Sequence, residues 1–164
     1  MNKIILFLVL LFNFNALADD REQYQSALMS EYQSLLTKDT FNQDRINEIE
    51  TIALENPYYE LRQWIALSYL INVEVIDSHP KNPKKAFNFV HKSIKENFFN
   101  SIPLAIFTTR YPGLKTERKD LIKTLNEKVS LYNLSRIPLA EIYILNGDYD
   151  SAFEALGSLK NKYL

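Results

Sequence analysis

The tetrapeptide Ile-Pro-Leu-Ala occurs twice in this chain, at residues 102–105 and 137–140, so the two copies lie 35 residues apart. The flanking residues keep their character at the same spacing, since Phe107 corresponds to Ile142. Self-similarity at a fixed spacing is the sequence signature of a protein built from repeated units. We therefore expect one structural unit to recur along the chain.

A weaker third copy lies at residues 64–69, where Ala66 takes the place of Ala105 and Ala140. Ala66 precedes Ala105 by 39 residues, and the polar segment 72–82 accounts for this longer spacing. Periods of about 34 to 40 residues are typical of solenoids made of helix hairpins.

Apolar residues recur at helical spacing throughout the chain, and alternation over the length of a strand is hard to find. With only 3 Gly in 164 residues, the sequence has little material for the tight turns of an all-β fold. We predict an all-α fold with helices over residues 20–38, 40–55, 58–71, 83–96, 101–111, 116–129, 135–145 and 149–162.

Several helix boundaries carry a recognisable signal. Thr40 with Gln43 three residues later has the pattern of a capping box, and Asn82 before Pro83 has the pattern of an N-cap followed by a proline in the first turn. The pair Asn146-Gly147 predicts a helix end, and Asp148 predicts the N-cap of the next helix.

The first 18 residues have the pattern of a signal peptide. Lys3 precedes an apolar run over residues 4–12, and Ala16-Leu17-Ala18 places small residues at a cleavage site, so we expect cleavage after Ala18. The alternative is a membrane anchor, but the apolar run is shorter than the roughly 20 residues needed to span a bilayer. The mature protein is then expected to be soluble in the periplasm or outside the cell.

Residues 139–152 read Leu-Ala-Glu-Ile-Tyr-Ile-Leu-Asn-Gly-Asp-Tyr-Asp-Ser-Ala. In a helix hairpin, the small Ala140 and Ala152 let the helices approach, Tyr143 fills the space between them, and Gly147 makes the turn. The segment resembles the tetratricopeptide repeat pattern, and residues 84–93 are similar to the second helix of a Sel1-like repeat. The middle repeat departs from the pattern, because Thr108 stands where a tyrosine is expected.

The resemblance covers about residues 42–164 and implies an antiparallel helix-hairpin α-solenoid of about three repeats. Residues 19–41 then form an N-terminal helix that precedes the repeat domain. The alternative is an ordinary bundle of eight helices in which the sequence similarity at a spacing of 35 residues arises by chance. In both cases the aromatic residues are expected in the core, namely Phe87, Phe89, Phe98, Phe99, Tyr143 and Phe153.

The resemblance also implies a concave binding face made by the first helix of each hairpin. Aligned on Ala66, Ala105 and Ala140, its partner-binding positions are Glu60, Gln63, Leu67, Phe99, Ile102, Ile106, Arg110, Leu134, Ile137, Glu141 and Ile144. Phe99, Ile102, Ile106 and Ile137 are the expected apolar anchors, with Arg110 and Glu141 at the rim. Two possibilities remain open: the face is an exposed patch that binds a partner, or the N-terminal helix folds back and covers it.

Residues for catalysis are sparse. The chain has no Cys, and its two His, His79 and His91, lack metal-binding spacing and are expected at the surface. The carboxylate pairs Glu48/Glu50 and Asp148/Asp150 are too close in sequence to flank a substrate, and no nucleophile-elbow, P-loop or dinucleotide fingerprint is present. We therefore expect no enzymatic activity, no cofactor and no metal.

The remaining expectations concern partners. With a net charge of -1, the protein lacks the positive electrostatic field that nonspecific binding of nucleic acid requires. No apolar stretch after residues 4–12 approaches transmembrane length. We expect a periplasmic protein-protein interaction module that acts as a scaffold or adaptor for an envelope protein. Some small periplasmic Sel1-like proteins are immunity proteins. The resemblance therefore also implies an alternative, an immunity protein that neutralises an antibacterial toxin delivered by a secretion system. A cell-envelope hydrolase is a third hypothesis.

Overall fold

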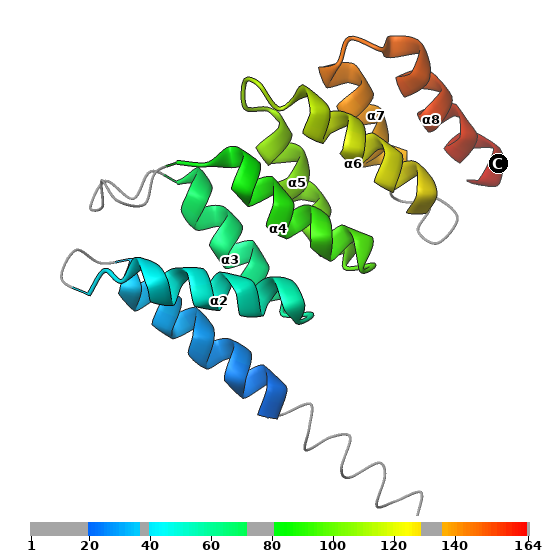
Figure 1. Ribbon diagram of the computed structural model, residues 1–164. Helices are drawn as coiled ribbons and strands as arrows, with labels where there is room; N and C mark the ends of the chain where they lie inside the picture. Colours follow the sequence, from blue (N-terminus) through cyan, green and yellow to red (C-terminus); the bar gives the residue numbers. More distant parts are fainter. Residues whose placement is uncertain (1–19, 37–39, 72–80, 129–135, 164) are drawn as a thin grey trace, which may run out of the picture.

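The computed structural model describes residues 20–36, 40–71, 81–128 and 136–163, and every regular element within these ranges is a helix (Figure 1). The all-α prediction is confirmed for this part of the chain. None of the described helices is long and apolar enough to cross a bilayer. The predicted signal peptide over residues 1–18, His79 and Leu134 lie outside the described residues.

The predicted helices are present, with ends that differ by a few residues. An N-terminal helix covers residues 20–35 and is followed by α2 (Gln43–Glu55), α3 (Tyr59–Leu70), α4 (Pro83–Lys95), the short 3-10 helix η1 (Phe99–Ser101), α5 (Ile102–Thr109), α6 (Lys115–Lys128), α7 (Arg136–Leu145) and α8 (Tyr149–Tyr163).

Two of the predicted N-caps are confirmed and one is wrong. Asn82 accepts a hydrogen bond from the Lys85 backbone N–H, and Asp148 accepts one from that of Ser151 at 3.1 Å. The predicted capping box at Thr40 is not formed, because the Thr40 hydroxyl donates to the Ser34 carbonyl instead. The N-cap of α2 is Asn42, whose side chain accepts from the Arg45 N–H.

Two helices end in the same left-handed turn. After α7, Gly147 has φ 76°, and the Asp148 N–H donates to the Tyr143 carbonyl at 2.9 Å. After α4, Asn97 has φ 69°, and the Phe98 N–H closes the equivalent bond to Ser93 at 2.9 Å. Both are Schellman motifs, in which a residue with positive φ satisfies carbonyls at the helix end. The sequence predicts only the first, because the second uses asparagine in place of glycine.

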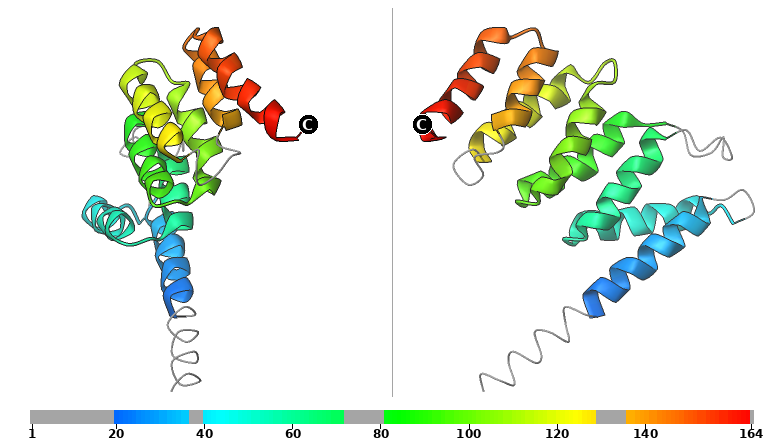
Figure 2. Two further views of the ribbon diagram at one scale, coloured as in Figure 1. Left: turned by 90° about the vertical axis from the view of Figure 1, so that its right-hand side faces the viewer. Right: turned by 180° about the vertical axis from the view of Figure 1, so that it is seen from behind.

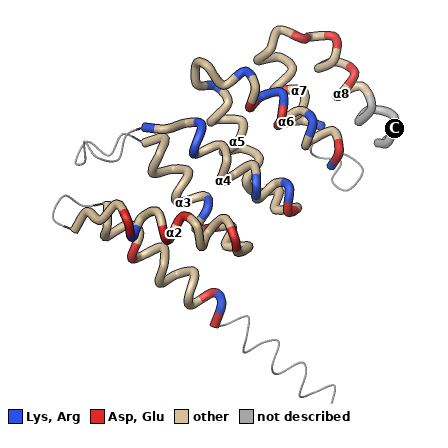
Figure 3. Tube along the Cα trace, in the orientation of Figure 1, with Lys and Arg blue, Asp and Glu red and all other residues tan. Residues whose placement is uncertain are grey.

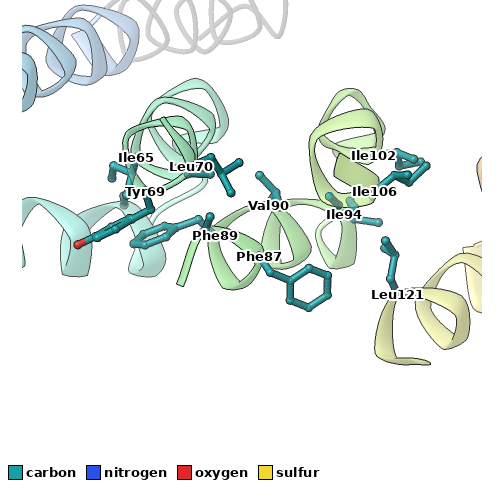
Figure 4. Close-up of a cluster of buried hydrophobic side chains, with 14 of the residues drawn as sticks. Ile65, Tyr69, Leu70, Phe87, Phe89, Val90, Ile94, Ile102, Ile106 and Leu121 are labelled. Carbon is teal, nitrogen blue, oxygen red and sulfur yellow. The ribbon is translucent and has the colours of Figure 1, made fainter. Parts of the chain in front are cut away.

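The helices stack in chain order along one direction, with the N-terminal helix at one end and α8 at the other (Figures 1 and 2). The main contacts join helices that are neighbours in the chain, such as α3 with α4 and α7 with α8, or helices two apart, such as α4 with α6 and α5 with α7. The hydrophobic core therefore runs through the stack as a continuous layer. Figure 4 shows part of this layer, where residues of α3, α4, α5 and α6 meet.

The three alanines that align with one another in the sequence all lie in this core. Ala66 and Ala105 are completely buried and Ala140 is 2% exposed. Phe87 and Phe89 are buried as expected, and Phe98, Phe99 and Tyr143 are partly buried. Phe153 is an exception to the predicted aromatic core, since it is 74% exposed. It lies on α8, at the end of the stack, where no described helix covers it.

Replacing Ala140 by leucine should lower the free energy of unfolding by about 1 to 3 kcal/mol, because the larger side chain must force α7 away from its neighbours. Chemical denaturation measures this change. The matched control is the same substitution at Ala27, an exposed position of the N-terminal helix, where we expect a change within about 0.5 kcal/mol. Equal stability of both variants would show that Ala140 is not a close contact.

Candidate functional site

A groove of about 520 Å³ lies between the first turns of α5 and α7. We call it the α5–α7 groove. Its lining combines apolar side chains with two polar ones, and consists of Phe99, Asn100, Ile102, Pro103, Ile106, Ile137, Pro138 and Glu141. Five of these, Phe99, Ile102, Ile106, Ile137 and Glu141, are among the binding residues predicted from the sequence.

The repeated Ile-Pro dipeptide builds both sides of this groove. Ile102-Pro103 begins α5, and Ile137-Pro138 occupies the first turn of α7. Proline is tolerated there because the first N–H groups of a helix have no partner within the helix. Since α5 and α7 contact each other, the two copies of the motif face one space. The spacing of 35 residues between the two Ile-Pro dipeptides therefore places both of them at the same groove.

The four predicted apolar anchors differ in their exposure. Ile102 and Ile106 are only 4% exposed, whereas Ile137 is 52% exposed and Phe99 is partly buried. Ile102 and Ile106 therefore do not belong to an exposed patch and form the floor of the groove. α5 contacts α4, α6 and α7, and these neighbours bury its two isoleucines.

The two residues predicted for the rim are paired with each other. An Arg110 guanidinium nitrogen lies 2.5 Å from a Glu141 carboxylate oxygen, and the two side chains are 53% and 42% exposed. An ion pair with this exposure adds only about 0 to 1 kcal/mol to stability. Both groups can therefore turn to a ligand at small cost, offering one cation and one anion beside an apolar floor.

The remaining predicted residues are not among the groove lining, although Gln63 contacts it through Asn100. Glu60 accepts a hydrogen bond from Gln25 of the N-terminal helix at 2.8 Å, and Gln63 donates to the Asn100 carbonyl at 3.2 Å. Leu67 is partly buried, and Ile144 is 49% exposed but does not line the groove. The structure thus gathers five of the predicted residues into one groove, with Arg110 paired to Glu141 beside it, and leaves Glu60, Leu67 and Ile144 apart.

The N-terminal helix does not cover this groove. None of its residues is among the groove lining. It packs against the first hairpin, where Arg21 donates to the Pro57 carbonyl at 2.8 Å and Tyr32 reaches Glu50 and Ser68. The alternative of a folded-back helix therefore applies to the end of the predicted face near Glu60 and not to the α5–α7 groove.

Sequence reasoning missed a buried polar cluster centred on Glu50. This carboxylate is 4% exposed, accepts from the Tyr69 hydroxyl at 2.5 Å and from that of Tyr32 at 3.2 Å, and pairs with Lys85 at 2.5 Å. Burial, with the nearby negative charge of Glu50, raises the pKa of both tyrosines above the ordinary range. The cluster joins the N-terminal helix, α2, α3 and α4. Its polar groups satisfy one another, which is the arrangement expected of a structural network.

His91 was expected at the surface, and this expectation is wrong. The residue is 7% exposed, packs on the Phe87 ring with 4.7 Å between ring centroids, and its Nε2 lies 2.8 Å from the Thr124 hydroxyl. Burial lowers the pKa of His91 to about 4, and Lys95 adds to this effect. Among the described residues, no group of three or more His, Cys, Asp or Glu could hold a metal ion.

Charged residues are unevenly distributed along the stack. Lys and Arg residues gather along α4 and α6 (Figure 3). Several of them are already paired, such as Lys84 with Glu117, Lys85 with Glu50 and Lys92 with Glu96. The small net charge is therefore a balance between differently charged parts of the protein.

Comparisons with protein-family models, curated proteins and solved structures find no significant match to this chain.

Proposed function

We propose that this chain is a tetratricopeptide- or Sel1-like α-solenoid of about three repeats that works as a non-enzymatic protein-protein interaction module in the bacterial periplasm. The regular spacing of buried alanines at residues 66, 105 and 140 supports the repeat, as do the contacts between α4 and α6 and between α5 and α7. In such arrays each unit packs on the next, and equivalent helices lie side by side.

The α5–α7 groove is the observation that carries the proposal. A partner inserts an apolar side chain between Phe99 and Ile137, onto the floor made by Ile102 and Ile106. Arg110 and Glu141 separate from each other and orient polar groups of the same partner segment. Interfaces concentrate their energy in a few apolar or aromatic anchors surrounded by polar groups, which matches this arrangement.

Ile137→Asp should weaken binding of the partner by about tenfold or more, because it places a charge in the groove at a position where the folded protein leaves the side chain 52% exposed. Ile106 is unsuitable for this test, since a charge at a 4% exposed position would unfold the protein. Partners are captured from envelope extract, identified, and measured again with the purified partner by calorimetry.

The matched control is Ile71→Asp. Ile71 is 59% exposed and lies at the end of α3, outside the groove, so its variant should bind like the unmodified protein. Equal binding by both variants would contradict the proposed site. The identity of the captured protein then separates the two roles, because a scaffold binds an envelope protein and an immunity protein binds a toxin.

A further inference from the structure

Basic residues are concentrated in the middle of the stack. Residues 81–128, which include α4 and α6, hold 11 Lys and Arg against 4 Asp and Glu, whereas residues 20–71 hold 4 against 9. The middle of the stack is therefore basic and its beginning is acidic (Figure 3). Because proteins select partners by complementary charge, such a region indicates an anionic partner.

α4 and α6 run parallel and side by side (Figure 1). Near their starts, Lys84 pairs with Glu117 at 3.5 Å. Near their ends, the Lys128 ammonium donates to the Lys95 carbonyl at 3.0 Å. The outward sides of the two helices therefore form one face, about 20 Å long, since the helices have 13 and 14 residues.

Lysines line this face at helical spacing. On α6, Lys115, Lys119 and Lys123 recur every four residues, opposite the buried side that carries Leu121 and Leu125. The lysines of α4 likewise lie opposite its buried residues, and all of these lysines are exposed or only partly buried. We call the set the lysine face, and it consists of Lys84, Lys92, Lys95, Lys115, Lys119 and Lys123.

Most of the lysine face has no acidic partner. Lys84 and Lys92 pair with Glu117 and Glu96, and the other four lysines form no ion pair with a described residue. Like charges four residues apart on a helix repel one another, so the row on α6 costs stability in the free protein. An anionic ligand would remove this cost.

The chemistry of the lysine face favours carboxylates. All of its cations are lysines, which act as point charges, whereas the planar guanidinium of arginine is the group that matches a phosphate with two hydrogen bonds. Among the described residues, none of the exposed large apolar side chains lies on α4 or α6. The face therefore lacks aromatic groups on which bases of a nucleic acid stack and apolar groups that enter a lipid surface.

Acidic flanks limit the size of the partner. α2 precedes α4 in the same row of helices (Figure 1), contacts it through the Lys85–Glu50 pair, and exposes Asp44 and Glu48. Beyond α6, residues 136–157 hold one Arg against 4 Asp and Glu. An extended polyanion, such as duplex DNA or a bilayer, would reach these flanks and be repelled, whereas an acidic segment about 20 Å long would not.

We propose that the lysine face binds an acidic segment of another protein, about 20 Å long, whose Asp and Glu side chains pair with Lys95, Lys115, Lys119 and Lys123. Complementary charge of this kind raises the association rate and selects the partner more than it adds affinity. The lysine face shares no residue with the α5–α7 groove, so this proposal does not depend on the groove.

The first test uses a fluorescent synthetic peptide of about 14 residues, with Glu at every third or fourth position and Ala elsewhere, which is about 20 Å long as a helix. Its binding to protein purified from cells that express the complete chain is measured by fluorescence anisotropy at about 50 mM salt. The matched peptide has Gln in place of each Glu. We expect binding of the Glu peptide alone, at least tenfold weaker at about 300 mM salt because salt screens exposed charges. Equal binding of both peptides, or of neither, would overturn the proposal.

Two variants with equal net charge locate the contact. Lys119→Gln/Lys123→Gln removes two cations of the lysine face and should weaken binding of the Glu peptide about fivefold or more. Arg21→Gln/Arg45→Gln removes two cations from the acidic beginning of the stack and should change binding by less than about twofold. Since glutamine is a good helix former, thermal unfolding should show the lysine variant to be as stable as the unmodified protein. Equal weakening by both variants would assign binding to net charge and contradict the proposed site.

Other occupants are tested with the same lysine variant. A DNA duplex of about 20 base pairs and vesicles of phosphatidylcholine and phosphatidylglycerol in equal parts should bind more weakly than the Glu peptide at the same concentration of negative charge. Tighter binding of either one, lost in Lys119→Gln/Lys123→Gln, would assign the face to nucleic acid or lipid and overturn the proposal. Light scattering of the protein alone tests a second copy, and self-association lost in this variant would overturn it as well.

Discussion

Arg62→Ala should lower the free energy of unfolding by about 3 to 5 kcal/mol, the range seen when one partner of a buried ion pair is removed. Arg62 is completely buried in the middle of the stack. Its guanidinium donates to the carbonyls of Ala53 and Asn56, each at 2.6 Å, and to the Glu96 carboxylate, also at 2.6 Å. One side chain thus satisfies carbonyl groups at the end of α2 and pairs with the C-cap of α4.

The loss arises because the alanine variant leaves buried carbonyls without donors and opens a cavity where the long side chain was. Glu96 is less affected, since its side chain is 32% exposed and also pairs with Lys92. Its pKa is lowered, because the hydrogen bonds from Arg62 and Lys92 outweigh the opposing effect of burial. Urea denaturation monitored by circular dichroism gives the stability change.

Two variants locate the source of this effect. Arg62→Lys should recover only part of the loss, because an ammonium group lacks the planar fork that reaches α2 and α4 together. Arg45→Ala is the matched surface control: Arg45 pairs with Glu31 at 2.6 Å and Glu48 at 2.7 Å, but all three side chains are substantially exposed. A change of about 1 kcal/mol or less is expected there. If Arg62→Ala cost no more than Arg45→Ala, the buried network would be unimportant.

Acidification from pH 7 to pH 5 should lower the free energy of unfolding by about 2 kcal/mol through His91 alone. The folded-state pKa of His91 is about 4, compared with an ordinary value of 6.5, because burial disfavours the charged ring. Above pH 6.5 both states carry neutral His91, and stability is unaffected. Below it the unfolded chain binds a proton that the folded protein does not, so stability falls by about 1.4 kcal/mol per pH unit until pH 4.

His91→Gln is the control for this prediction, since glutamine does not titrate. Its stability should be lower than that of the unmodified protein at pH 7 but should change less between pH 7 and pH 5, as measured by denaturation at each pH. Lowered carboxyl pKa values such as that of Glu96 contribute only at lower pH, because their stabilisation is lost as pH falls through the folded-state pKa. Parallel loss of stability in both proteins would assign the pH dependence to other groups.

The sequence predicts the helices well because their signals are local. Proline and N-cap residues mark where α4 and α8 begin, and the period of 35 residues places Ile102-Pro103 and Ile137-Pro138 at equivalent positions. The groove between them follows once α5 and α7 are neighbours. The spacing does not predict how deeply each side chain is buried, because burial depends on which further helices pack against α5 and α7. Ile102 and Ile137 are equivalent in sequence yet differ from 4% to 52% in exposure.

The buried charges are missed for a related reason. Glu50 and Lys85 are far apart in sequence, as are Arg62 and Glu96, so no local pattern connects either pair. In the sequence, Glu50 is marked only by its neighbour Glu48, which is exposed and pairs with Arg45. The single hint is that Arg62 stands within an otherwise largely apolar helix, between Leu61 and Ile65. Long-range pairing of this kind requires the packed structure.

Because the main contacts join helices no more than two apart, each part of the stack can form once the helices beside it are present, without the rest of the chain. A helix forms in about a microsecond or less, so joining neighbouring helices and not a distant terminus sets the order of folding. The hairpin of α2 and α3, with the N-terminal helix tied to it through Tyr32 and Glu50, can therefore pack before α7 and α8 have folded. An incomplete stack exposes the apolar side of its last helix until the next helix packs on it, so folding of this chain can spread from one end of the stack to the other.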